Sequence, residues 1–139
     1  MNIKEIQNEI VSEFSMFDDW MERYEYIIEL GKGLPLIAEE FKTDDNIIQG
    51  CQSKVWVHAE EKDGKVFFSS DSDAILTKGI IAILIRAFSN QTPANILEAN
   101  TDFIDEIGLK EHLSATRANG LVSMIKKIKM YALSFEARN

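Results

Sequence analysis

The sequence predicts an α+β fold in which helices pack on a small antiparallel three-stranded sheet. Apolar residues recur at helical spacing near both ends of the chain, whereas residues 55–69 resemble two strands joined by an Asp63-Gly64 hairpin turn. Helix and strand signals are grouped rather than alternating, which is typical of α+β proteins. With 139 residues and no internal repeat or linker, the chain is expected to form one domain over residues 1–139.

Helix signals dominate the first third of the chain. Apolar residues at helical spacing predict a first helix over residues 3–14. Asp18 or Asp19 can cap a second helix, which is expected to end at Gly31. After a break, residues 36–41 are expected to form one helical turn before a polar loop.

Residues 55–60 are rich in strand formers and alternate in polarity. One face of this expected strand carries Val55, Val57 and Ala59, and the other carries Trp56, His58 and Glu60. Residues 66–69 are expected to return as the paired strand. Because an isolated hairpin is only marginally stable, we expect a third strand near residues 46–50.

Four further helices are expected after the sheet. Asp71 and Asp73 favour a capping role at the start of the most apolar helix, over residues 75–88, rather than acid–base chemistry. Two short helices are expected next, one opened by Thr92-Pro93 and one over residues 102–107. Ser114 is expected to cap the long final helix.

The composition excludes several classes of function. A net charge of −8, from 23 acidic and 15 basic side chains, argues against a nucleic-acid partner. No apolar run approaches the roughly 20 residues that span a bilayer, so no membrane association is expected. A single cysteine forms no internal disulfide, and with two scattered histidines it predicts no metal site. No signal-peptide pattern is visible at the N-terminus, so a cytoplasmic location is the default expectation.

The candidate catalytic residue is Cys51, the only cysteine, which lies between an expected loop and an expected strand. Free cysteine is most often a small buried apolar residue, but this one is flanked by Gly50, Gln52 and Ser53 rather than by an apolar stripe. His58 is roughly 20 Å away along an extended strand, at about 3.3 Å per residue, and is a poor candidate base. A nucleophilic cysteine without a paired base fits a group carrier better than a hydrolase.

Three other positions stand out. Arg117 falls in the first turn of the final helix, where a positive charge is unfavourable, so both a partner-binding role and a merely tolerated arginine stay open. Gly120 is unusual inside a helix and suggests close packing or backbone approach. Trp20 and Trp56 are expected in the core, as aromatic residues at helix and strand positions usually are.

The string Gln49-Gly50-Cys51-Gln52-Ser53-Lys54-Val55-Trp56 resembles the SufE family of sulfur-acceptor proteins in iron–sulfur cluster assembly. Further segments resemble the family in the same order along nearly the whole chain: Trp20 to Gly31, Asp71 to Ala74 with Lys78-Gly79, and Leu113 to Leu121. One departure is Ala115, where the family commonly has proline. It affects the expected geometry at the start of the final helix.

The resemblance implies a SufE/IscU-like α+β fold and a sulfur carrier. Cys51 would take persulfide sulfur from a pyridoxal-phosphate cysteine desulfurase of the SufS type, stimulate that enzyme, and pass the sulfur to a SufBCD-type scaffold. Arg117, Asp73 and Gln52 would serve partner binding, with Asp73 influencing how readily the cysteine loop opens. The pyridoxal phosphate belongs to the desulfurase, and no cofactor or metal is expected on this chain.

The resemblance describes an accessory sulfurtransferase rather than a stand-alone enzyme. A CsdE-like acceptor for a different desulfurase is the nearest alternative, and the sequence does not separate the two. An IscU-like cluster scaffold shares the fold, but a single cysteine opposes it. A binding module with an inert cysteine is a third alternative, and the oligomeric state, a homodimer included, stays open.

Overall fold

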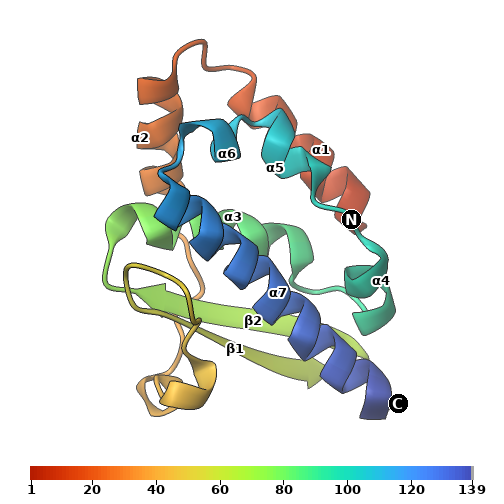
Figure 1. The fold of residues 1–139 in the computed structure, drawn as a ribbon. Coiled ribbons are helices and arrows are strands. Elements are labelled where there is room, and N and C mark those ends of the chain that lie inside the picture. The colour runs from red at the N-terminus through yellow and green to blue at the C-terminus, as the bar shows by residue number, and fades with distance from the viewer. Residues whose placement is uncertain (139) are drawn as a thin grey trace.

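The computed structural model describes residues 1–138 and shows an α+β arrangement (Figure 1). The α-helices are α1 (Ile3–Phe14), α2 (Trp20–Gly31), α3 (Ile75–Phe88), α4 (Pro93–Glu98), α5 (Asp102–Glu106), α6 (Leu109–His112) and α7 (Ala115–Arg138). Two short 3-10 helices, η1 (Glu39–Phe41) and η2 (Asp44–Asn46), precede the strands β1 (Val55–Lys62) and β2 (Lys65–Ser72). The α+β fold class predicted from the sequence is confirmed.

The two strands form the predicted antiparallel hairpin. Asp63 and Gly64 both adopt positive φ angles, 54° and 78°, which is what a two-residue turn of this type requires. The register pairs Val57 with Ser70 and Ala59 with Phe68, so these four residues share one face, and all of them are buried. The predicted apolar face of the first strand is therefore correct.

The predicted third strand is wrong. Residues 46–50 contribute one isolated bridge, between Ile47 and Trp56, and the N–H of Ile48 donates to the carbonyl of Val55 at 2.8 Å. Asn46 still belongs to η2, and Gly50 takes a φ of +88°, so the extended stretch between them is too short to form a ladder. Within residues 1–138 the sheet has two strands.

Helices supply the stabilisation that a two-stranded sheet lacks. The buried face of the hairpin packs against α3 and α7, and α7 runs diagonally across the sheet in Figure 1. Helix α3 is the most buried element and also contacts α1 and α2 on its other side. The core is therefore centred on α3, as its strongly apolar sequence predicts.

Helices α2 and α3 cross with almost no space between their backbones. A Cβ atom placed on Gly79 would lie 2.1 Å from the carbonyl oxygen of Ile27, and one placed on Gly31 would lie 2.9 Å from the Gly79 nitrogen. Both distances are far below van der Waals contact. The pair of glycines is therefore what allows α2 to pack directly on α3.

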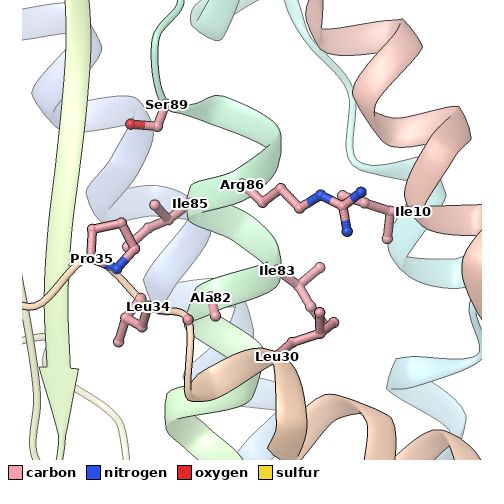
Figure 2. A pocket seen from close by; sticks show the side chains of 10 residues that line it. Ile10, Leu30, Leu34, Pro35, Ala82, Ile83, Ile85, Arg86 and Ser89 are labelled. Carbon is pink, nitrogen blue, oxygen red and sulfur yellow. The ribbon is translucent and has the colours of Figure 1, made fainter.

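A largely apolar hollow of about 360 Å³ lies between three elements (Figure 2). These are α1, α3 and the turn that follows α2. At its edge, the guanidinium of Arg86 turns toward α1, where it pairs with Glu9 at 2.6 Å and with Glu13 at 2.5 Å. The hydrogen bond from Arg86 is the main reason that the pKa of Glu13 is lowered. This cluster ties α1 to α3 and contains none of the predicted site residues.

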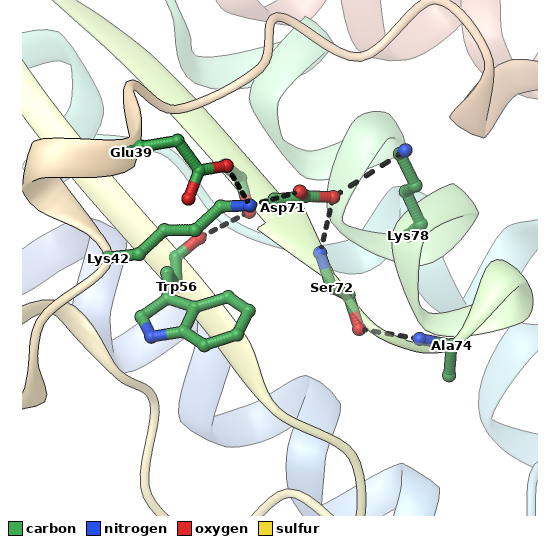
Figure 3. Close-up of polar contacts among 8 residues, drawn as sticks. Glu39, Lys42, Trp56, Asp71, Ser72, Ala74 and Lys78 are labelled. Atoms are coloured by element: carbon green, nitrogen blue, oxygen red, sulfur yellow. Dashed lines mark hydrogen bonds and ion pairs between the residues drawn. The ribbon is translucent and has the colours of Figure 1, made fainter.

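The expectation that Asp71 and Asp73 cap α3 is wrong. The cap position is Ala74, which makes no side-chain cap hydrogen bond. Asp71 belongs to β2 opposite Trp56, and its carboxylate pairs with Lys42 at 2.8 Å and with Lys78 at 3.5 Å (Figure 3). A side chain directed outward from a strand does not reach the free N–H groups of the helix that follows.

The other predicted caps and ends agree more closely with the structure. Asp19 caps α2, Thr92 caps α4, and the hydroxyl of Ser114 accepts the N–H of Arg117 at the start of α7. The helical turn predicted over residues 36–41 is confined to η1.

The two tryptophans are only half-buried rather than core residues. Trp20 stacks on His112, and Trp56 lies beneath the Lys42 ammonium, which is 5.5 Å from its ring.

The crossing of α2 and α3 gives a stability test. We expect Gly79→Ala to lower the free energy of unfolding by about 3 kcal/mol or more, because its methyl group has no room beside the Ile27 carbonyl. Gly33→Ala is the matched control, since the nearest atom to a Cβ at that position is 3.7 Å away. Urea unfolding measures both, and equal stability of the two variants would contradict the close crossing.

Candidate functional site

Cys51 lies at the tip of a short loop, residues 49–53, that leads into β1. The side chain is half-buried against α7, and its Sγ atom is 3.7 Å from the carbonyl oxygen of Gly120, to which the thiol donates a weak hydrogen bond. The preceding Gly50 has a φ of +88°, a left-handed conformation that glycine adopts without strain. This turn directs Cys51 toward the helix.

Both ends of the cysteine loop are anchored by hydrogen bonds. On one side the N–H of Ile48 donates to the carbonyl of Val55 at 2.8 Å. On the other side the N–H of Lys54 donates to Oδ1 of Asp73 at 3.1 Å, and the N–H of Asp73 donates back to the Lys54 carbonyl at 3.3 Å. Asp73 therefore serves as a loop anchor rather than a helix cap.

The thiol faces a small hollow between the loop, α3 and α7. Its volume is about 10 Å³, which is room for about one water molecule. The lining residues are Cys51, Gln52, Ser53, Thr77, Ile80, Thr116, Arg117, Gly120 and Met124. Three of the four predicted site residues, Cys51, Gln52 and Arg117, thus lie together around the hollow. Asp73 does not line the hollow and contacts the end of the loop at Lys54.

The chain is similar in sequence and in fold to several known proteins. The family model described as "SufE: Fe-S metabolism associated domain" matches residues 8–132. This chain belongs to the SufE family. It is 42% identical over 130 residues to an uncharacterized SufE-like protein of Rhizobium meliloti, a match that covers 90% of this chain and 93% of the relative.

Two further relatives extend the comparison. An uncharacterized SufE-like protein of Synechocystis is 40% identical, over 91% of this chain and 80% of its own length. A SufE-like protein of Arabidopsis thaliana, named as chloroplastic/mitochondrial, is 37% identical over 94% of this chain but only 35% of its own length.

The solution structure of a hypothetical protein from Thermus thermophilus matches with a TM-score of 0.77. The match covers 93% of this chain and 94% of that one at 19% identity, which shows a shared fold.

Membership of the SufE family implies a role in Fe–S metabolism and in sulfur transfer.

The surroundings of the SufE-family cysteine keep its thiol protonated. Burial raises the pKa of Cys51 because the charged thiolate, once removed from water, is less stable than the neutral thiol. His58, the residue that the sequence disfavours as a base, stacks on Phe41 with ring centroids 3.8 Å apart and contacts Glu60 at 3.2 Å. Its ring nitrogen is therefore engaged on the opposite face of the sheet from the core.

Arg117 is exposed at the rim of the hollow, in the first turn of α7 as the sequence predicts. Its guanidinium donates to the hydroxyl of Tyr24 on α2 at 3.2 Å. Within residues 1–138 no carboxylate forms an ion pair with it, so no acidic side chain neutralises its charge. The neutral Tyr24 contact orients the side chain across the gap between two helices.

The sequence gives little indication of the remaining residues of the hollow. Thr77 and Ile80 on α3 and Thr116 and Met124 on α7 come together only through helix packing, which no local motif records. Gly120 is the exception, since a glycine inside a helix already suggests close approach. Within residues 1–138 there is no cluster of three or more His, Cys, Asp or Glu that could hold a metal ion, and no helix is long and apolar enough to cross a membrane.

The raised pKa of Cys51 makes stability depend on pH in one direction. Below the pKa of an unfolded thiol, about 8.5, both states are protonated and the full stability is present. As pH rises from there through the folded pKa, the unfolded chain ionises first and stability falls. We therefore expect the wild type to lose unfolding free energy relative to Cys51→Ser as the pH rises above about 8.5 in urea titrations. Parallel pH curves for the two proteins would contradict a buried, protonated thiol.

Proposed function

We propose that this chain is a sulfur carrier for iron–sulfur cluster assembly. Cys51 receives sulfur from the persulfide of a pyridoxal-phosphate cysteine desulfurase of the SufS type and passes it to a scaffold of the SufBCD type. The observation that carries the proposal is the position of the single cysteine of a SufE-family chain, at the tip of a loop anchored at both ends. Removal of the persulfide from the desulfurase also stimulates that enzyme.

The transfer is a thiol–persulfide exchange that needs no external oxidant. The Cys51 thiolate attacks the outer sulfur of the donor persulfide, and a new S–S bond forms as the old one breaks. The electron pair of the old bond stays on the donor cysteine, which leaves as a thiolate and can take up the proton that Cys51 lost. Cys51 then carries the sulfane sulfur, and a second exchange of the same kind releases it to the acceptor.

The surroundings of Cys51 suit activation by a partner. A thiol with a raised pKa is a weak nucleophile on its own, so the complex must supply a more favourable environment for the thiolate. In this proposal Arg117 binds an acidic group on the desulfurase, Gln52 contacts the partner from the exposed loop, and Asp73 controls how readily the loop opens. The chain itself holds no cofactor, because the pyridoxal phosphate stays on the desulfurase.

Labelled-sulfur transfer tests the proposal directly. A persulfide-loaded desulfurase is mixed with the wild type and with Cys51→Ser for a single turnover, and intact mass is read with and without reductant. We expect a reductant-labile gain of about 32 Da, one sulfur atom, on the wild type alone.

Two other outcomes of this experiment are decisive. A wild type that gains no mass from any loaded desulfurase of the same cell would be a binding module with an inert cysteine, which rejects the proposal. Loading by a second desulfurase but not by the SufS type would favour a CsdE-like acceptor.

Arg117 is expected to contribute to docking rather than to the exchange step. Removing a charged hydrogen-bonding group at an interface weakens binding by about 1.5–3 kcal/mol. Arg117→Ala should therefore raise the KM of the desulfurase for this chain roughly 10- to 100-fold, with a smaller change in kcat. Arg138→Ala, at the exposed far end of α7, is the matched control. Steady-state desulfurase assays measure both. An unchanged KM for Arg117→Ala would remove this residue from the interface.

A further inference from the structure

The contact between Cys51 and α7 depends on the absence of a side chain at position 120. Gly120 is buried in the second turn of α7, where glycine is less favourable than alanine. A Cβ atom placed there would lie 3.1 Å from Cys51 Sγ and 3.7 Å from its Cα. Any other residue at position 120 would therefore require the closed thiol to shift by at least a few tenths of an ångström.

A second contact one helical turn further on repeats this arrangement. A Cβ atom on Gly50 would lie 3.1 Å from the Ser123 hydroxyl, and Gly50 also has a positive φ that other residues adopt only with strain. Consecutive loop residues, 50 and 51, thus lie against helix positions 123 and 120. The loop docks through close backbone approach.

Little else holds the tip of the loop down. Within residues 1–138, the backbone groups of residues 49–53 make no hydrogen bond to another residue, and the one bond from this segment is the weak S–H donation from Cys51 to the Gly120 carbonyl. The strong hydrogen bonds lie outside it, at Ile48 and Lys54. The tip can therefore separate from α7 while both anchors stay in place.

We propose that Gly120 is a positioning residue that receives the Cys51 thiol in the closed loop and thereby sets the balance between closed and open loop. A larger residue at position 120 displaces the thiol and populates the open loop. The closed contact itself is a property of this chain, whereas its effect on sulfur loading rests on the function proposed above.

Alkylation of Cys51 tests the positioning role without any partner. We expect the iodoacetamide rate at pH 7.5 to rise about threefold in Gly120→Ala and at least tenfold in Gly120→Val, and the pH–rate profile to shift toward lower pH as the thiol becomes hydrated. Gly33→Ala, at a glycine where an added Cβ makes only an ordinary contact of 3.7 Å with the Leu30 carbonyl oxygen, should leave the rate unchanged. Rates equal to wild type in folded Gly120→Ala and Gly120→Val would overturn the proposal.

A double-mutant cycle provides a second readout if the valine variant does not fold. In the Cys51→Ala background the space is vacant, so Gly120→Ala should raise the melting temperature as an alanine inside a helix normally does. In the wild-type background the same substitution should give a smaller rise or a fall. Equal shifts in the two backgrounds would show that the thiol and position 120 do not interact, which also overturns the proposal.

Sulfur loading separates this inference from the proposed function. At limiting desulfurase, we expect Gly120→Ala to gain the 32 Da adduct faster than the wild type and to lose it faster to added reductant. A wild type that never loads would reject the carrier function, while faster alkylation of Gly120→Ala would still support the positioning role. Faster alkylation with unchanged loading would show that Gly120 affects the loop of the free protein but not the rate of sulfur loading.

Discussion

The burial of one face of a two-stranded hairpin is the constraint on which the rest of the structure depends. Two strands alone are marginal in water, so α3 and α7 must lie side by side on the face that carries Val57 and Ala59. That packing brings Ile80 of α3 and Met124 of α7 together next to the entry of β1. The hollow that receives Cys51 is a consequence of how the sheet is covered.

The site combines firm anchors with a loosely held tip. Asp73 fixes Lys54 by reciprocal hydrogen bonds, and the Asp71 cluster with Lys42 and Lys78 fixes the end of β2 that presents Asp73 (Figure 3). The tip, in contrast, rests on α7 by packing and a weak thiol hydrogen bond. Local opening energies vary across a protein in this way, and weakly bonded segments open first. The Cys51 thiol is therefore carried by a segment that is held more weakly than its surroundings.

The sequence predicted the parts of this protein that local chemistry determines. The Asp63-Gly64 turn, the caps Asp19 and Ser114, and the alternation along β1 each depend on nearby residues, and the structure confirms them. The predictions of a third strand and of a capping role for Asp73 are wrong because each of these features depends on tertiary contacts. The hollow also depends on tertiary contacts, so the sequence did not predict it. Cys51 was visible from its flanking residues, and Gly120 from its low helix propensity, but their contact at 3.7 Å spans 69 residues of sequence.

A protonated, half-buried thiol is well suited to a carrier that must react only with chosen partners. An exposed thiolate would exchange with any disulfide or oxidant it met, because thiolate character and access determine thiol reactivity. Burial lowers both for Cys51, and no neighbouring base restores them within residues 1–138. Under the proposed function, reactivity comes from a partner that draws the loop away from Gly120 and stabilises the thiolate. Arg117, one turn before Gly120 on the same helix, places the expected docking charge beside the contact that the partner must break.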